Sequence, residues 1–383
     1  MVEIKHLGTE QRNDKTKDLD LFSTMQILEV MNEEDLNVVA GVKKALPQIE
    51  VVVKAMIETL KNGGRIIYAG AGTSGRTGVI DAVECGPTFS CTYEFVALMC
   101  GGPGALFKAV EGAEDRGDFC VEDLNVVAGV KEALPQIEKV VEAAANTIQN
   151  GGRVIYIGAG TSGRTGLIDA VECGPTFGCT DEFMGVLAGG LPAVVKSAEG
   201  AEDSKELAVE DVKKINLTNK DLVIGIAASG RTPYPMGAME YMHSIGGKTA
   251  SISCNKNAEL SKYADYPIEV SAGPEVLTGS TRLKSGTCQK IICNMISTST
   301  MVRVGKVYKN LMIDVKATNL KLQARARKIV MEAAECDYET ADKALIETND
   351  NTKLAVTMIL FNKTKDEAEK ALAEAKGLIR NVK

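Results

Sequence analysis

The stretch RVIYIGAGTSGRTG, residues Arg153–Gly166, joins a short apolar run to a glycine-rich loop. The run is rich in β-branched residues and is bounded by glycines, which is typical of a strand buried in a parallel sheet. A glycine loop that follows such a strand places free backbone N–H groups at the start of a helix. The stretch therefore predicts a strand, a tight loop and a helix that continues to about Glu172.

The same loop occurs twice, because GAGTSGRTG stands at residues 70–78 and again at 158–166. The surrounding blocks 63–92 and 151–180 align without a gap and differ at four positions. Solenoid repeats are shorter and more numerous than two long, almost identical copies. We interpret the pattern as an internal duplication of part of one domain, with units at about 33–120 and 121–208.

Strand and helix signals alternate beyond the repeat. Further strands are expected near residues 183–190, 221–230, 248–254 and 266–273, followed by a long helix at roughly 284–304. This alternation predicts an α/β fold with a doubly wound parallel sheet. The Ala-, Glu- and Lys-rich tail predicts a C-terminal helical bundle. Apolar residues at helical spacing precede each glycine loop, and Pro135 is expected to open a new helical segment.

The chain divides into four predicted parts: an N-terminal arm (1–32), a partial duplicate (33–120), a complete sheet domain (121–320) and a helical subdomain (321–383). The last strands of the sheet, expected within residues 221–273, occur once in the chain. The two repeat units, each of which supplies the first strands of a sheet, therefore compete to pair with them. The second half-unit is joined to those strands by a short linker, whereas the first must span the inserted unit. Loop closure favours the second by roughly 1–2 kcal/mol at most. The partial duplicate is expected to leave strand edges open.

Composition restricts the class of function. Of the 383 residues, 45% are hydrophobic and 25% charged, a globular balance. A net charge of −7 without a Lys/Arg block argues against nucleic-acid or anionic-membrane binding. Ten cysteines without a CxxC pair argue against zinc and favour reduced, cytoplasmic thiols. No apolar run reaches the ~18 residues of a membrane span. With two histidines in the chain, carboxylates are the expected acid–base groups.

Three hydroxyl-rich loops precede helices and are candidate phosphate and sugar ligands. An anion is favoured at such helix starts, although each hydroxyl can equally be a helix cap, and Arg164 and Arg231 can equally form surface ion pairs. The loops lack a Walker lysine and a ribose-binding acid, which disfavours nucleotides. Three such loops in one sheet favour a phosphosugar. The candidates are Gly160, Thr161, Ser162, Gly163, Arg164, Ser229, Gly230, Arg231, Thr232, Ser280, Thr281 and Lys284.

Five segments in order carry a family resemblance: GAGTSGRTGVIDAVECGPTF, AVEGAED, GIAASGRTPY, SISCN and GPEVLTGSTRLKSGT. Together they closely resemble the N-acetylmuramic acid 6-phosphate etherase family, and more distantly the glucokinase regulatory proteins and other sugar isomerase (SIS) domains. The resemblance covers the whole chain once one 88-residue unit is set aside, which leaves 295 residues. One departure is Gly86 and Gly174, where relatives usually carry proline.

The resemblance implies a reaction and its residues. The lactyl ether of a phosphorylated amino sugar is cleaved by elimination and hydration, with no metal or organic cofactor, in a protein that usually forms a homodimer. The family's two catalytic glutamates match Glu172 and Glu202 in the second unit, and Glu84 and Glu114 in the first. Glu172 is the implied acid and Glu202 the implied base, a division of labour that two differently tuned carboxylates can supply. The residues alone would place Glu202 in a solvated acidic turn.

Two other functions stay open at this point. A sugar-phosphate-responsive regulatory protein needs the phosphosugar loops and not the glutamate pair, so the presence of both glutamates favours an enzyme. An aldose–ketose phosphate isomerase also works through an open-chain aldehyde. The loop at residues 70–78 lacks its own copies of the Ser229 and Ser280 segments, so we expect it to be the poorer site.

Overall fold

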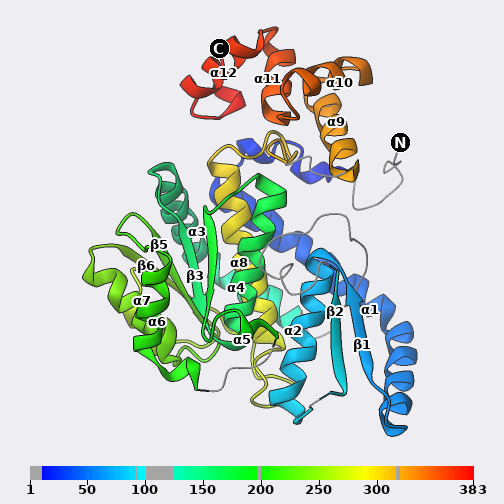
Figure 1. Ribbon diagram of the computed structural model, residues 1–383, viewed down its shortest axis with the longest axis vertical. Helices are drawn as coiled ribbons and strands as arrows, with labels where there is room; N and C mark the ends of the chain where they lie inside the picture. Colours follow the sequence, from blue (N-terminus) through cyan, green and yellow to red (C-terminus); the bar gives the residue numbers. More distant parts are fainter. Residues whose placement is uncertain (1–10, 92, 101–123, 196–199, 316–319) are drawn as a thin grey trace. The chain divides into compact units, whose positions relative to one another are not determined.

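The computed structural model describes residues 11–91, 93–100, 124–195, 200–315 and 320–383. Within these residues the chain forms two units. One combines residues up to Val30 with Cys173–Thr180 and Thr298–Lys383, and the other combines Met31–Glu172 with Asp181–Ser297. Figure 1 shows the strands of the two sheets. All of these strands and both glycine loops lie in the second of these units. The four-part division made from the sequence stays a prediction.

A five-stranded parallel sheet forms the centre of this larger unit. Its strands stand in the order β4-β3-β5-β6-β7. The side chains of β3 and β5 are buried throughout, as expected for apolar runs covered on both faces. The strands are β3 (Val154–Gly158), β4 (Phe183–Leu187), β5 (Leu222–Ala227), β6 (Lys248–Ser253) and β7 (Tyr266–Glu269).

Helices cover both faces of this sheet, which confirms the doubly wound fold. Ile155 and Ile157 of β3 pack into an apolar cluster with α6 (Lys205–Lys214) and α7 (Pro233–Ser244). On the opposite face Tyr156 donates a hydrogen bond to the carbonyl of Cys293 in α8 (Lys284–Arg303) at 3.3 Å. The predicted helix at 284–304 is therefore confirmed.

The first copy forms a separate two-stranded parallel sheet. Its strands β1 (Ile66–Gly70) and β2 (Phe95–Met99) pair in the same register as β3 and β4. The strands of the second copy are the ones that join β5, β6 and β7. The single set of last strands thus pairs with its near neighbour along the chain, as loop-closure entropy favours.

The helix of each copy that precedes the glycine loop is continuous. These helices are α1 (Thr24–Lys61) and α3 (Leu124–Gln149), and the prediction that Pro135 opens a new helical segment is wrong, because Pro135 lies inside α3. An interior proline costs about 3 kcal/mol. The apolar stripe of α3 offsets that cost, since Val130, Ile137 and Val141 are fully buried.

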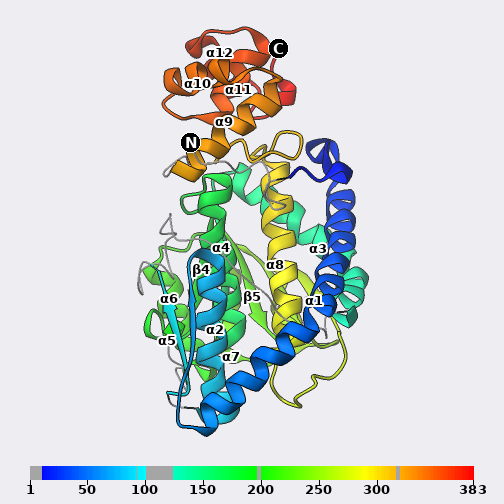
Figure 2. The same ribbon diagram turned by 90° about the vertical axis from the view of Figure 1, so that its right-hand side faces the viewer.

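The helix after each glycine loop is α2 (Gly72–Phe89) in the first copy and α4 (Gly160–Phe177) in the second. Figure 2 shows the two side by side. Val79 of α2 and Leu167 of α4 share an apolar cluster with Leu187, Ala193 and Val194, near the short helix α5 (Pro192–Val195). Part of the helix predicted after β4 falls on residues 196–199, outside the described residues.

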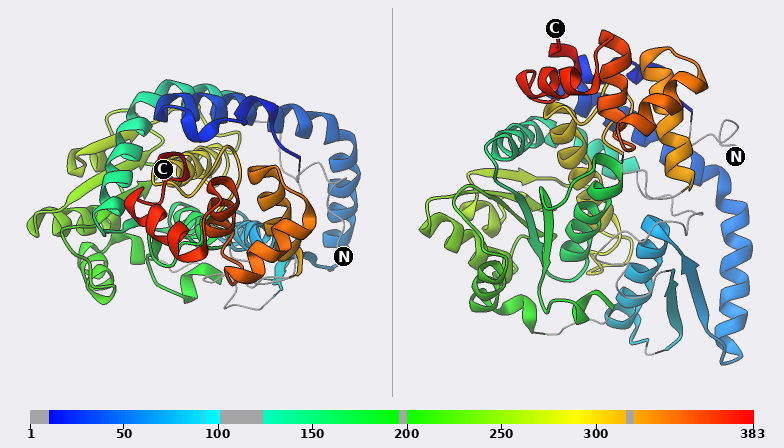
Figure 3. Two further views of the ribbon diagram at one scale, coloured as in Figure 1. Left: turned by 90° about the horizontal axis from the view of Figure 1, so that it is seen from above. Right: turned by 45° about the horizontal axis from the view of Figure 1, so that its top comes forward.

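The C-terminal tail is helical, as predicted. Four helices gather around one apolar cluster that includes Leu322, Val330, Leu345 and Val356 (Figure 3). Side-chain caps begin two of them, from Asp337 and Asn351, and a capping box at Thr364 and Glu367 begins the last. The helices are α9 (Leu320–Ala334), α10 (Tyr338–Glu347), α11 (Thr352–Phe361) and α12 (Lys365–Glu374). In the described part of the chain, no helix is long and apolar enough to cross a membrane.

Candidate active site

The β3–α4 loop is built on close backbone contacts that require glycine. A Cβ on Gly163 would lie 2.4 Å from the carbonyl oxygen of Gly158, and Gly160 has a positive φ of 52°. Glycine relieves both constraints. The first turn of α4 therefore begins directly at the carboxyl end of β3. Ser162 is buried in that turn, whereas Thr161 is partly exposed.

The loop after β5 lies at the same edge of the sheet, because β5 runs parallel to β3 and pairs with it. Ser229 accepts a hydrogen bond from the backbone N–H of Arg231 at 3.2 Å, and both side chains are exposed. Gly230 is buried with a positive φ of 68°. Thr232 precedes α7 and provides no side-chain cap for it. The hydroxyls of Ser229 and Thr232 therefore do not cap α7.

The third loop, residues 277–282, precedes α8. Glu275 caps the start of that helix, because its carboxylate accepts hydrogen bonds from the backbone N–H groups of Lys284 and Ser285, each at 2.9 Å. Lys284 is buried. Sequence reasoning missed Glu275, although an acidic residue shortly before a helix start is a usable signal.

A pocket of about 360 Å³ opens between the first copy and two of these loops, the β3–α4 loop and the loop at residues 277–282. Such a volume lies in the range of small-molecule sites. It is lined by Thr161 of the second copy and by the loop containing Ser280 and Thr281, which lies beyond the repeat. From the first copy it is lined by Glu84, Pro87 and Thr88 of α2. A predicted glutamate and predicted hydroxyls from two copies of the repeat therefore share one cavity.

Two further contacts join α2 to the Ser280 loop. The hydroxyls of Thr88 and Ser280 are 3.4 Å apart. Arg282 donates to the carboxylate of Asp81 at 2.6 Å, and its guanidinium lies over the Phe89 ring, 5.6 Å from the ring centre. Arg282 was not singled out from the sequence, where it was only one residue of the TRLKSGT run. These contacts fix the loop against α2.

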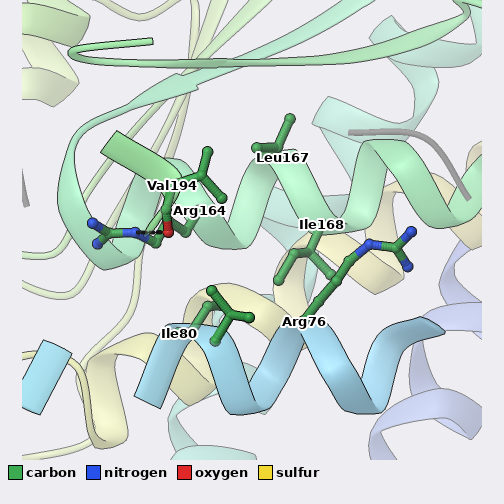
Figure 4. A pocket seen from close by; sticks show the side chains of 7 residues that line it. Arg76, Ile80, Arg164, Leu167, Ile168 and Val194 are labelled. Carbon is green, nitrogen blue, oxygen red and sulfur yellow. Dashed lines mark hydrogen bonds between the residues drawn. The ribbon is translucent and has the colours of Figure 1, made fainter. Parts of the chain in front are cut away.

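Two reciprocal ion pairs connect α2 with α4. Arg164 of the second copy pairs with Glu84 of the first, and Arg76 of the first pairs with Glu172 of the second. Both arginines are buried, with 2% or less of the side chain exposed. Figure 4 shows Arg76 and Arg164 at opposite ends of the contact between the helices, with Ile80, Leu167 and Ile168 between them.

Arg164 is held from a second side as well. Its guanidinium donates to the carbonyl oxygens of Ala193 at 2.6 Å and Val194 at 3.4 Å. Burial lowers the pKa of Arg164, and the Glu84 carboxylate counteracts that shift. The pairing is buried rather than the surface ion pair considered from the sequence. These partners occupy the guanidinium, and phosphate binding by Arg164 stays a prediction.

The remaining predicted residues lie elsewhere. Glu172 does not line the pocket, and Glu202 is exposed in a 3-10 turn, η6 (Ala201–Asp203). Glu114 lies outside the described residues. The Ser229–Thr232 loop and Lys284 are not among the lining residues of the pocket. Cys173 and Cys179, which follow Glu172 along the chain, are buried.

No group of three or more His, Cys, Asp or Glu side chains in the described ranges is arranged to hold a metal ion. The described cysteines, nine in number, are free.

Two family models match the chain. The model for the glucokinase regulatory protein N-terminal SIS domain matches twice, at residues 48–137 and 136–243, and the SIS domain model matches residues 204–299. The double match of one model agrees with an internal duplication. Among solved structures, a phosphoheptose isomerase from Neisseria gonorrhoeae is similar with a TM-score of 0.35 and 12% identity, covering 46% of this chain and 92% of that one.

Two curated relatives carry the same family name. The chain is 54% identical over 261 residues to N-acetylmuramic acid 6-phosphate etherase 2 of Enterococcus faecalis, covering 68% of this chain and 88% of that protein. It is 44% identical over 378 residues to the etherase of Listeria monocytogenes serotype 4b, covering 99% of this chain and 98% of that protein. A match of 261 residues at 88% coverage corresponds to a relative of about 297 residues, close to this chain without one repeat unit. The chain belongs to the N-acetylmuramic acid 6-phosphate etherase family, with part of its SIS domain duplicated.

Proposed function

We propose that this protein cleaves the lactyl ether of N-acetylmuramic acid 6-phosphate, giving N-acetylglucosamine 6-phosphate and D-lactate. The observation that carries the proposal is the pocket in which Glu84 of the VECGPT motif meets Thr161, Ser280 and Thr281. A carboxylate opposite a hydroxyl-lined wall suits proton transfer beside a bound polyhydroxyl ligand.

The reaction proceeds by elimination followed by hydration. The open-chain aldehyde acidifies the proton at C2, a base removes it, and the electron pair forms the C2=C3 double bond. The C3–O bond breaks at the same time, and an acid protonates the departing lactate oxygen. Water then adds hydroxyl to C3 and a proton returns to C2, so that one water molecule is consumed overall.

Two glutamates divide the proton transfers in this proposal. The glutamate of the VECGPT motif, Glu172 or its repeat Glu84, acts as the acid for the lactate oxygen. The glutamate of the EGAED motif, Glu202 or its repeat Glu114, acts as the base for the C2 proton or the water. Two carboxylates in different surroundings can hold the different protonation states that these steps need. Glu84 is partly buried, with 12% of its side chain exposed, whereas Glu202 is exposed.

The substrate phosphate and hydroxyls are assigned to the three loops. Backbone N–H groups at the start of α4, from Gly160 to Gly163, present a positive helix end to the phosphate. Ser229, Gly230, Arg231 and Thr232 extend the same edge of the sheet, with Arg231 exposed and available to an anion. Ser280 and Thr281 contact sugar hydroxyls from the opposite wall, with Lys284 at the start of α8 behind them.

The free cysteines support a reducing, cytoplasmic location. We also propose a homodimer, supported by the open edge of β1, which has no neighbouring strand on its other side among the described residues.

Release of D-lactate from N-acetylmuramic acid 6-phosphate, measured with D-lactate dehydrogenase, tests the activity. The expected result is one lactate for each N-acetylglucosamine 6-phosphate formed. Binding of sugar phosphates without turnover would instead identify a regulatory protein. Conversion of an aldose phosphate to a ketose phosphate, without lactate, would identify an isomerase.

A further inference from the structure

We infer that α2 of the first copy stands where α4 of a second molecule would stand, and that it delivers Glu84 as the working glutamate of the second copy's pocket while Glu172 is a spare. This assignment rests on the proposed etherase function and names the glutamate of the VECGPT motif that takes part in its proton transfers. It gives the duplicate a role in catalysis that the sequence alone left undecided.

The contact between α2 and α4 has the form of a two-fold interface. The two helices have 18 residues each and differ at one position, Val79 against Leu167. In a two-fold contact, residue i of one partner meets residue j of the other, and j meets i. The pairs Arg164–Glu84 and Arg76–Glu172 follow this rule, because the corresponding residues are 88 positions apart in both cases. A helix is thus paired with its own copy inside one chain.

The two ends of this contact are chemically unequal. At one end Glu84 lies with Thr161 and the Ser280 loop in the pocket of about 360 Å³. At the other end Glu172 pairs with Arg76 of the first glycine loop. The segment GPEVLTGSTRLKSGT occurs once in the chain, and its single copy is used at the Glu84 end. The Ser280 loop therefore adjoins Glu84, and the chain has no second copy of it to adjoin Glu172.

Arg164 acts as a positioning residue for Glu84. It is buried and held by the carbonyls of Ala193 and Val194, so the side of its guanidinium that faces Glu84 has a fixed direction. Two fixed partners on one guanidinium leave Glu84 few alternative orientations. The glutamate is therefore held toward the pocket that Thr161 and Ser280 complete.

The test compares Glu84→Gln with Glu172→Gln in the full-length chain. Each substitution removes one carboxylate from an ion pair with a buried arginine, so their effects on thermal stability should be similar. We expect E84Q to lower kcat for D-lactate release by about 100-fold or more, since acid–base groups contribute roughly 10²–10⁴-fold. We expect E172Q to lower kcat at least about tenfold less than E84Q does, because Glu172 is not among the residues that line the pocket.

Product binding separates a chemical role from a folding defect. Titration calorimetry with N-acetylglucosamine 6-phosphate should give E84Q an affinity close to that of the unmodified chain. Loss of both binding and turnover in E84Q would overturn the catalytic role of Glu84.

Three turnover results would also overturn the inference. They are loss of activity in E172Q with activity kept in E84Q, loss in both variants, and loss in neither. An unmodified chain that binds the product but releases no D-lactate would reject the proposed function itself, and the glutamate assignment with it.

Discussion

Leu46 and Leu134 occupy the same position in the two copies, yet 40% of Leu46 is exposed and 4% of Leu134. The difference arises because α3 lies against the five-stranded sheet, whereas the first copy has no such sheet beside it. Leu134→Ala should lower the free energy of unfolding by about 2–5 kcal/mol, the usual cost of emptying a buried leucine site. Leu46→Ala should cost less than about 1 kcal/mol.

Urea unfolding of both variants measures these costs under one set of conditions. Equal costs would show that the first copy is as well packed as the second. The matched pair removes helix propensity as an explanation, because the substitution and the local sequence are the same.

Asp169 is a second residue whose surroundings differ from those of its repeat, Asp81. Burial raises the pKa of Asp169 to about 6, although Asn294 and Ser297 donate hydrogen bonds to its carboxylate at 2.7 and 3.1 Å. A raised folded-state pKa means that stability is greatest below the unfolded pKa, near 3.8, and is lost as the pH rises toward 6. Asp169→Asn should remove this loss, so from pH 4 to 7.5 the variant should gain roughly 2–3 kcal/mol relative to the unmodified chain.

Chemical unfolding at several pH values between 4 and 7.5 checks this expectation for Asp169. Parallel curves for D169N and the unmodified chain would contradict it, since they would show that another group governs the pH dependence in this range.

At the scale of elements, β1 and β3 have nearly the same sequence and different neighbours. The backbone N–H of Ile66 donates to Glu94 beside β2, so the next residue, Ile67, directs its N–H toward the other edge, where no described strand lies. The corresponding Ile155 faces β5 and is fully buried, whereas Ile67 is 51% exposed.

Proline substitutions at Ile67 of β1 and Ile155 of β3 test whether the backbone N–H at each position bonds to a neighbouring strand. Ile155→Pro removes a ladder hydrogen bond and a buried side chain, and should lower stability by more than about 3 kcal/mol or prevent folding. The N–H of Ile67 faces no strand among the described residues and its side chain is half exposed, so Ile67→Pro should cost about 1–2 kcal/mol. Thermal unfolding followed by circular dichroism measures both, and a severe effect of I67P would mean that another strand pairs with β1 in solution.

Patterns within single elements were sufficient to predict most of the fold. The β-branched runs bounded by glycines predicted the strands near 153–158 and 221–230. The repeat predicted that two half-units compete for one set of last strands, and the second copy is the one that pairs with them. The prediction that Pro135 opens a new helical segment was wrong, because the buried apolar stripe of α3 offsets the cost of an interior proline. The sequence could not predict that Glu84 pairs with Arg164, because the VECGPT motif is identical in the two copies. The two glutamates differ only in the residues that surround them in the folded chain.

For the whole molecule, removing residues 33–120 leaves a chain of 295 residues with the face of α4 uncovered. Because α4 matches α2 almost completely, two shortened chains should pair through α4, each supplying Glu172 to the other. We expect a dimer by light scattering and D-lactate release that is abolished by Glu172→Gln in the shortened chain. A folded, monomeric and fully active shortened chain would contradict this expectation.

A final consequence concerns the two ion pairs between α2 and α4. In an assembly of identical subunits, every mutation in the gene appears on both sides of the symmetry axis. Here the two sides are encoded separately, so the codon for Arg76 can change while the codon for Arg164 is kept. Selection can therefore act on one end of the contact alone, and the glycine loop at residues 70–78 is released to drift or to acquire a different ligand.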